Sequence, residues 1–408
     1  MTTLSRPTVA VGELRAPGAP APAGGIPLCV PEIRGNEWQY VHECLDTGWV
    51  SSVGAYVNRF ERMLAETVGT SHAVATASGT AALHTALLVA GVEPDDEVLV
   101  STLTFIAPAN AVRYVGAWPV FMDAEPRYWQ MDPQYVVDFL RRHCRRSGGV
   151  WRQRATGRRV RALLPVHVLG HPADMSSLVD VAREHELVVI EDASESLGAS
   201  CHGMPVGKLG DIACFSFNGN KLLTTGGGGM LVTDDPAYAA RARYLTTQAK
   251  DDPIEYVHGA VGYNYRLTNV QAAIGVAQLE QLDRYVEAKR RIADRYADAF
   301  DGIPGLCQMA EAPWARATFW MYTMLVNPVG FGRSSRDLLK LLDLQRIQAR
   351  PLWQPLHRSP AHAGSPLADC PVADELYEAA LSLPCSVGLS EADQQRVIAV
   401  VRAAAVDG

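Results

Sequence analysis

The stretch CFSFNGNKLLTTGGGGMLVT, residues 214–233, contains one lysine, Lys221, and no other charged residue. An apolar run precedes this lysine, and four consecutive glycines, 226–229, follow shortly after it. Most lysines lie at the surface with their ammonium group in water. A lysine that is taken out of water instead becomes a nucleophilic amine, which is suited to forming a Schiff base. The surroundings of Lys221 favour this second interpretation, in an uncharged pocket where glycine permits close backbone approach to a ligand.

On both sides of this stretch, short apolar runs alternate with helical patterns. The apolar runs of strand length are HAVATAS (72–78), EVLVST (97–102), WPVFMD (118–123), RALLPVHV (161–168), ELVVIED (186–192), IACFSF (212–217) and GMLVT (229–233). Helical patterns occur at TAALHTALLVA (80–90) and IAPANAVRYV (106–115). Buried strands that alternate with helices predict an α/β fold with a mostly parallel central sheet covered on both faces.

The 408 residues also indicate how the chain is divided. Residues 1–25, rich in proline, alanine and glycine, are expected to form a mobile tail. Residues 26–268 are expected to form a large domain, and residues 269–408 a smaller C-terminal α/β domain. The segment 269–300 has the period of one long amphipathic helix. An arginine-rich insert at 141–161 predicts a solvated surface hairpin, or alternatively a basic contact for an anionic substrate or a partner subunit.

The composition argues against several classes of protein. A net charge of −7 gives no general affinity for nucleic acid. Eight cysteines without a C-x-x-C pair indicate reduced thiols in a cytoplasmic protein. The N-terminal residues show no secretory h-region, and no apolar run reaches the ~18 residues that a membrane helix needs. We therefore expect a cytoplasmic protein that binds neither nucleic acid nor membrane.

Two further motifs place polar groups at the ends of predicted strands. Ser78-Gly79-Thr80 lies where a strand meets a helix, and the free N–H groups of a helix N-terminus suit a phosphate. Taken alone, this motif favours an ordinary helix cap over a phosphate site. Asp192 ends a buried strand, where ligands bind in open α/β sheets, and it needs a cationic or metal partner there. His167 and His171 are four residues apart but lie at a strand end without a convincing ligand set, so no metal site is expected.

The phosphate cradle, Asp192 and Lys221 together point to pyridoxal phosphate as the cofactor. In this interpretation Asp192 keeps the pyridine nitrogen protonated, so that the ring can act as an electron sink. Lys221 would hold the aldehyde of the cofactor. Both residues are therefore the candidate catalytic residues.

Seven motifs, spread from about residue 28 to residue 400, carry a resemblance to a known family. They are GWVSSVGAYVNRFE (48–61), ATASGTAALHTAL (75–87), EVLVSTLTFIAPANAV (97–112), VHVLGHPADM (166–175), VVIEDASESLGA (188–199), GDIACFSFNGNKLLTTGGGGML (210–231) and GYNYRLTNVQAAIG (262–275). In these motifs the chain resembles the DegT/DnrJ/EryC1/StrS sugar aminotransferases, which have pyridoxal phosphate fold type I. The resemblance implies a set of cofactor-binding residues: Gly79, Thr80, Phe105, Asp192, Glu195, Ser216, Asn218, Lys221 and Asn264.

The resemblance also implies individual roles within this set. Gly79, Thr80 and Ser216 would hold the phosphate, and Phe105 would stack on the ring. Asn264 would reach the phosphate of the neighbouring subunit, so that a homodimer would share its active sites. Most of the family has Gln or His at the position of Glu195, near the ring hydroxyl, and this chain departs from that pattern.

The expected substrate is a nucleotide sugar, with L-glutamate as the amino donor. The motifs NGNKLLTTGGGGM, GWVSSVG and ARPLWQPLH (349–357) most resemble a branch of the bacillosamine and legionaminic acid type. That branch aminates the 4-keto carbon of UDP-2-acetamido-2,6-dideoxy-hexos-4-ulose. The substrate-binding residues expected on this basis are Ser51, Arg350, Trp353 and His357.

Three alternatives remain open from the sequence. The first is transamination of another ketone, such as a GDP- or dTDP-linked keto sugar or a cyclitol, which would use the same cofactor residues. The second is a sugar dehydratase that depends on pyridoxal phosphate, although in that branch histidine replaces the lysine that Lys221 represents. The third is a non-catalytic regulator that binds pyridoxal phosphate.

Overall fold

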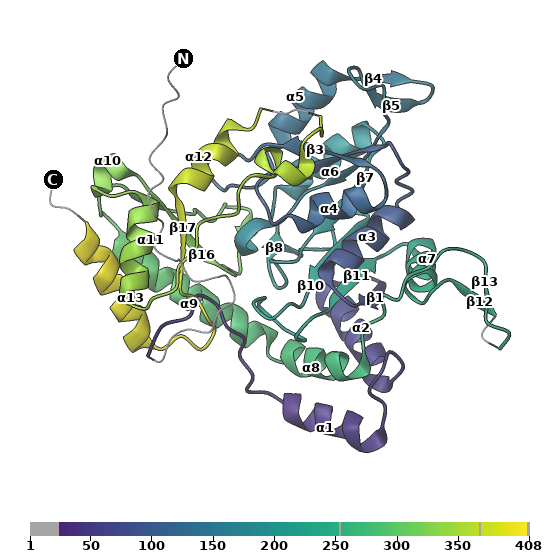
Figure 1. Ribbon diagram of the computed structural model, residues 1–408, viewed down its shortest axis with the longest axis horizontal. Helices are drawn as coiled ribbons and strands as arrows, with labels where there is room; N and C mark the ends of the chain where they lie inside the picture. The colour runs from purple at the N-terminus through teal and green to yellow at the C-terminus, as the bar shows by residue number, and fades with distance from the viewer. Residues whose placement is uncertain (1–23, 253, 367–368, 406–408) are drawn as a thin grey trace, which may run out of the picture.

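The computed structural model describes residues 24–252, 254–366 and 369–405, and its central feature is a seven-stranded sheet (Figure 1). The strands of this sheet are β1 (His72–Thr76), β2 (Glu97–Ser101), β3 (Trp118–Met122), β6 (Val160–Leu164), β7 (Val188–Asp192), β10 (Ile212–Ser216) and β11 (Gly229–Thr233). They lie in the order β1-β11-β10-β7-β6-β2-β3. The pairs from β10 to β3 are parallel, whereas β11 runs antiparallel to both of its neighbours. The predicted α/β fold with a mostly parallel sheet is confirmed.

Helices cover both faces of this sheet because its strands alternate their side chains between two apolar cores. The helices around the sheet are α2 (Ala55–Val68), α3 (Gly79–Val89), α4 (Ala107–Tyr114), α5 (Pro133–His143), α6 (Met175–Glu184) and α7 (Pro236–Thr246). On β2, Leu99 joins the core formed with α5 and α6, while Val98 and Val100 join the core formed with α3 and α4. The carboxyl ends of the parallel strands therefore meet at one edge, between the two helical layers.

The segment predicted as one long helix is two helices, α8 (Asn269–Leu279) and α9 (Leu282–Phe300). Gln281 interrupts them with φ −108° and ψ 4°, outside the helical range. Most residues of α8 are buried, because this helix packs against α1 (Glu37–Thr47) and α2. The helix α9 is instead amphipathic and runs on toward the C-terminal part of the chain (Figure 1). The two helices thus have different packing partners, and the prediction of a single helix was wrong.

The C-terminal part is built on a second, antiparallel sheet of β14 (Leu306–Gln308), β16 (Tyr322–Val326) and β17 (Ala380–Leu383). Its helices are α10 (Pro328–Phe331), α11 (Ser335–Leu344), α12 (Pro371–Ala379) and α13 (Glu391–Ala404). The remaining short elements are η1 (Val168–Gly170), η2 (Leu356–Arg358), η3 (Pro360–His362), β8 (Ser200–Cys201), β9 (Met204–Pro205), β15 (Ala315–Arg316), β12 (Lys250–Asp252) and β13 (Val257–His258). A domain boundary at residue 268 remains a prediction. The expected N-terminal tail lies outside the described residues except for Gly24 and Gly25.

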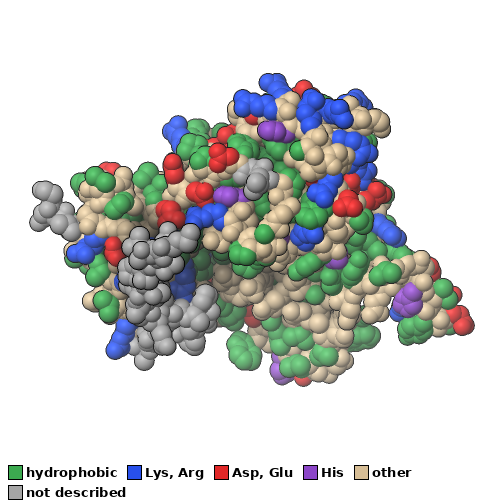
Figure 2. Space-filling view, turned by 45° about the horizontal axis from the view of Figure 1, so that its top comes forward, with side chains coloured by type: hydrophobic (Ala, Val, Ile, Leu, Met, Phe, Trp, Pro, Cys, Tyr) green, Lys and Arg blue, Asp and Glu red, His purple; other side chains and the backbone are tan. Residues whose placement is uncertain are grey.

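The arginine-rich insert forms a hairpin of β4 (Cys144–Ser147) and β5 (Val150–Gln153). It projects from the large sheet (Figure 1), and Lys and Arg side chains gather at that end of the molecule in Figure 2. The side chain of Arg146 is exposed and pairs with Glu186 at 2.9 Å, as expected of a solvated face. The predicted surface hairpin is confirmed. Within the described ranges, the helices are all too short or too polar to cross a lipid bilayer.

Candidate active site

Lys221 lies in the turn that follows β10, at the edge where the parallel strands end. Its backbone N–H donates to the Asn218 carbonyl at 3.0 Å, which fixes the turn. The side chain is 14% exposed, and Nζ lies 4.2 Å from the centre of the Trp320 ring. The same Nζ lies 3.4 Å from Oε1 of Glu195. The predicted uncharged pocket is therefore wrong, because the fold brings an acidic residue from another part of the chain to this lysine.

Two buried carboxyls, Asp192 and Glu195, face Lys221. Asp192 ends β7 and accepts a hydrogen bond from the Ser194 N–H at 3.0 Å. Glu195 accepts one from the Leu169 N–H at 2.8 Å. Burial raises the pKa of Asp192 and that of Glu195, while the charge of Lys221 opposes both increases. A buried carboxylate with so few donors needs a cation beside it, and a protonated pyridine nitrogen fits that need at Asp192.

The predicted phosphate cradle lies where the start of α3 meets β10 and β11. Ser78 caps α3 by accepting the Ala81 N–H at 3.1 Å, so the ordinary helix-cap interpretation is also correct. A Cβ added at Gly79 would lie 2.7 Å from Cβ of Ser216. A Cβ added at Gly229 would lie 2.6 Å from the Gly79 nitrogen. Glycine is thus required at both positions. Binding of a phosphate by the first N–H groups of α3 beside Ser216 remains a prediction.

The other predicted cofactor residues lie around this centre without a contact that assigns their roles. Phe105 is 52% exposed and lies just before α4. Thr80 is partly buried in the first turn of α3, and Asn218 is exposed in the turn before Lys221. Asn264 is exposed in a segment that runs beside the cradle, since the Ala77 N–H donates to the Tyr265 carbonyl at 2.7 Å. The cofactor contacts of these four predicted residues stay predictions.

Two of the predicted substrate residues are held close to the ends of the parallel strands. Trp353 stacks on Trp320 with ring centres 6.4 Å apart and planes 7° apart, and Trp320 in turn covers Lys221. His357 bonds through Nδ1 to Thr102 Oγ1 at 2.8 Å, directly after β2. Arg350 is partly buried, and its guanidinium donates to the Ala349 carbonyl at 2.8 Å.

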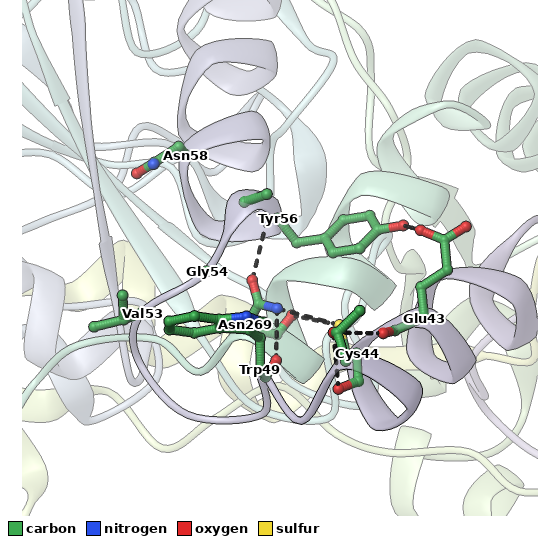
Figure 3. Close-up of a pocket in the computed structure, with 10 residues that line it drawn as sticks. Glu43, Cys44, Trp49, Val53, Gly54, Tyr56, Asn58 and Asn269 are labelled. Atoms are coloured by element: carbon green, nitrogen blue, oxygen red, sulfur yellow. Dashed lines mark hydrogen bonds between the residues drawn. The ribbon is translucent and has the colours of Figure 1, made fainter.

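The fourth predicted substrate residue, Ser51, is exposed on the loop between α1 and α2. Trp49 and Val53 of the same loop line a separate pocket of about 470 Å³ (Figure 3). The amide of Asn269 organises this loop by donating to the Trp49 carbonyl at 2.7 Å and accepting the Tyr56 N–H at 3.0 Å. The Asn269 N–H also donates to the Ser51 carbonyl at 2.6 Å. Trp49, Tyr56 and Asn269 line the pocket, which shares no lining residue with the Lys221 centre.

Trp320 and Asn269 are the structural residues of this region that the sequence did not predict. Trp320 lies in an apolar stretch without a turn or charge signal, and only folding brings it to Lys221. Asn269 begins α8 between Thr268 and Gln271, which form a capping box that marks a helix start but not a contact with a distant loop. Each acts by holding other groups in place.

The two histidines considered as metal ligands have structural partners instead. His167 pairs with Glu191 at 2.9 Å, and both side chains are fully buried. His171 accepts the Ala312 N–H at 3.0 Å. Over the described parts of the chain, no group of three or more His, Cys, Asp or Glu residues could hold a metal ion.

The mostly parallel sheet carries a lysine after β10, a buried aspartate at the end of β7 and a glycine cradle at α3. This combination defines an enzyme class, the fold type I enzymes that use pyridoxal phosphate. The chain belongs to the DegT/DnrJ/EryC1/StrS aminotransferase family, whose sequence model matches residues 31–402. It is therefore a sugar aminotransferase that depends on pyridoxal phosphate.

Individual relatives cover most of the chain. The GDP-perosamine synthase of Caulobacter vibrioides is 40% identical over 377 residues, which cover 92% of this chain and 97% of that protein. EpsN of Bacillus subtilis, a putative pyridoxal phosphate-dependent aminotransferase, is 38% identical over 92% of this chain and 95% of its own length. The crystal structure of S. venezuelae DesV matches with a TM-score of 0.81 and 33% identity, covering 91% of this chain and 95% of that one. These relatives do not single out the UDP-linked branch that the sequence motifs predict.

Proposed function

We propose that the protein transfers the amino group of L-glutamate to the 4-keto carbon of a nucleotide-linked 4-keto-6-deoxy sugar. The observation that carries this proposal is the position of Lys221, with Nζ 3.4 Å from Glu195 and near the buried Asp192. The similarity to a GDP-perosamine synthase over 92% of the chain supports a GDP-linked sugar as the preferred substrate. The product would serve polysaccharide biosynthesis in the cytoplasm.

The chain's own residues would divide the work of this reaction. Pyridoxal phosphate, when bound, supplies the electron sink that makes the hydrogen on the donor's Cα acidic. Lys221 moves that proton as general base and then general acid. Asp192 would stabilise positive charge at the ring nitrogen, and Glu195 accepts a hydrogen bond from the Lys221 amine at 3.4 Å. The N–H groups at the start of α3 bind the phosphate.

Two lines of support disagree about the nucleotide and about the substituent at carbon 2 of the sugar. Three sequence motifs resemble the branch that acts on a UDP-linked 2-acetamido sugar, whereas a relative at 40% identity is a GDP-perosamine synthase. A site that hydrogen-bonds one substituent leaves buried polar atoms unpaired when the other sugar binds. Such a loss costs about 1–3 kcal/mol, or roughly 5- to 150-fold in kcat/KM.

A competition assay tests this choice of substrate. GDP-4-keto-6-deoxymannose and UDP-2-acetamido-4-keto-6-deoxyhexose are offered together with L-glutamate, and products are separated by mass. We expect kcat/KM to be roughly 5- to 150-fold higher for the GDP sugar. Lys221→Ala protein, which should be inactive on both, is the matched control. Equal values, or a preference for the UDP sugar, would contradict the proposed nucleotide while leaving the aminotransferase assignment intact.

We also propose that the active enzyme is a homodimer with shared sites. Large apolar side chains are exposed on α1 and the loop after it, with Trp38 83%, Trp49 57% and Val53 67% exposed. Large exposed apolar side chains that gather on one part of a chain are typical of protein interfaces. The family resemblance adds that Asn264 would reach across such an interface to the partner's phosphate.

A further inference from the structure

Two cysteines and a buried lysine lie together beside the backbone of Trp320, and none of the three is a candidate catalytic residue. Lys289 lies on α9 and is 1% exposed. Its Nζ lies 3.4 Å from Sγ of Cys29 and 3.6 Å from Sγ of Cys385, and it donates to the Trp320 carbonyl at 2.8 Å. In the described part of the chain, the partners of this ammonium group are thus one carbonyl and two thiols, with no carboxylate among them.

This arrangement favours a thiolate at Cys29. A buried ammonium group without a counter-charge is costly, and a neighbouring thiolate removes that cost. A hydrogen bond from the Cys385 thiol, together with the charge of Lys289, lowers the pKa of Cys29 to about 6. The pKa of Cys385 is raised, first by its hydrogen bond with Cys29 and then by burial. Near neutral pH Cys29 is therefore the nucleophile, and Cys385 remains a thiol.

The two cysteines differ in solvent exposure, as a two-step oxidation by a dissolved oxidant requires. Cys29 is partly exposed, whereas Cys385 is 1% exposed beneath it. The Cys385 N–H donates to the Leu28 carbonyl at 2.8 Å, so the two chain segments are held side by side. We therefore expect a small oxidant to reach Cys29 before Cys385, which would then react with the product.

We propose that Cys29 and Cys385 form an oxidation site for a peroxide, with Lys289 as the residue that activates Cys29. The Cys29 thiolate attacks the peroxide O–O bond and takes one hydroxyl group, and the hydroxide that leaves is protonated to water. The Cys385 sulfur then attacks the Cys29 sulfur and forms the S–S bond. The hydroxyl group leaves with the Cys385 thiol proton as a second water. Two thiols lose two electrons in total, and hydrogen peroxide is reduced to two waters.

This site is connected to the active site through Asn220. The Asn220 carbonyl accepts a hydrogen bond from the protonated Cys29 thiol at 3.4 Å and one from the Trp320 indole N–H at 2.7 Å. Trp320 covers Lys221, which is the next residue after Asn220. Disulfide formation would remove the thiol hydrogen that Cys29 donates to this carbonyl. We therefore expect oxidation to lower turnover, a consequence that rests on the proposed function.

Peptide mapping tests the site without any substrate. The reduced holoenzyme is treated with hydrogen peroxide, blocked with an alkylating agent and digested. We expect a peptide pair linked through Cys29 and Cys385 in the wild-type protein and in Cys307→Ser, since Cys307 is an exposed thiol on β14, outside this cluster. The linked pair should be absent from Cys29→Ser and Cys385→Ser and should disappear on reduction with dithiothreitol. Wild-type protein in which Cys307 is oxidised while Cys29 and Cys385 stay unlinked would overturn the proposal.

The pH dependence of alkylation tests the role of Lys289. Labelling of Cys29 in the wild-type protein should rise with a midpoint near pH 6, below the value of about 8.5 for a free cysteine. Lys289→Met should move the Cys29 midpoint upward by at least about one unit, and Lys289→Arg should restore it. A wild-type midpoint near that of free cysteine, about 8.5, contradicts the activation, whether or not the variants fold.

Turnover measured on the same oxidised samples tests the coupling. We expect oxidised wild-type enzyme to lose activity and regain it with dithiothreitol, and Cys385→Ser to show no such reversible loss. Unchanged turnover in fully linked enzyme would contradict the coupling to Lys221. Because the disulfide is mapped without substrate, failure of the proposed function would leave the mapping result as it stands.

Discussion

At the scale of single residues, the active centre is one amine opposite two buried carboxyls. Burial raises the pKa of Asp192 and of Glu195 above their ordinary values. An acid whose pKa is raised on folding binds more protons in the folded state. Its contribution to stability is therefore lost as the pH rises from its ordinary pKa of about 4 through the raised value. At neutral pH these groups weaken the fold unless a cation pairs with them, as expected of a binding site.

The Asp192→Asn variant separates the stability cost of burying this carboxylate from its proposed role in catalysis. In the cofactor-free protein the Tm at neutral pH should be no lower than that of the wild type, because the variant buries no charge at this position. In the loaded enzyme the ring nitrogen loses its counter-ion, and removal of one partner of a buried pair costs about 3–5 kcal/mol. We therefore expect kcat to fall by roughly 10²- to 10⁴-fold. Thermal unfolding and single-turnover rates measure the two effects, and an unchanged kcat would refute the ring-nitrogen role.

The sequence could predict Lys221 and Asp192 because each has a local pattern, an isolated lysine before glycines and an acid at the end of an apolar strand. It could not predict the surroundings of Lys221. The Glu195 carboxylate and the Trp320 ring reach it from separate segments. The uncharged pocket expected from the neighbours in sequence was wrong for that reason, since charge at a site depends on neighbours in space.

At the scale of elements, the predicted cofactor cradle is formed by three elements. Their backbones lie too close together for a side chain to fit between them. The start of α3 lies against β10 and β11, and Gly79 and Gly229 fill the contact. Alanine at a helix position is normally more stable than glycine by about 1 kcal/mol. The helix would thus gain from a side chain at Gly79, while the packing against Ser216 forbids it.

Gly79→Ala should therefore weaken cofactor binding. Its Cβ would meet Cβ of Ser216 at 2.7 Å, so the helix start has to move away from β10. We expect the Kd for pyridoxal phosphate to rise by about tenfold or more, since each misplaced hydrogen bond to a charged group costs about 1.5–3 kcal/mol. Gly227→Ala is the matched control, because its Cβ would meet only Gln271 at an ordinary 3.6 Å. Absorbance titration measures both, and an unchanged Kd for Gly79→Ala would count against the cradle.

The limits of sequence patterns at this scale are clear from α8 and α9. The apolar period of 3.6 residues continues across Gln281, since both helices are regular and the interruption is short. The period reports which residues form a helix face, but not that α8 packs on α1 and α2 while α9 continues toward the C-terminal part. The strands were easier to predict, because each is a separate apolar run bounded by polar residues.

At the scale of the whole molecule, the exposed apolar residues and the exposed Asn264 raise the same question of assembly. Trp38, Trp49 and Val53 are large side chains left open to solvent in a single chain. Asn264 lies in a segment beside the cradle of its own chain, and the family resemblance places it against the phosphate of the partner. Composition and periodicity carry no information on such an interface, so the homodimer is expected on the resemblance and the exposed surface alone.

Mixing two inactive variants tests whether the sites are shared. Lys221→Ala lacks the amine, and Asn264→Ala lacks the group proposed to cross the interface. In a mixed dimer with shared sites, one site carries both lesions and the other carries none. Equal mixing with free exchange gives half mixed dimers, so activity should recover to about one quarter of the wild-type value. Native mass spectrometry must show exchange, and Asn264→Ala alone must be inactive. If mixed dimers then form without recovered activity, each active site is built from a single chain.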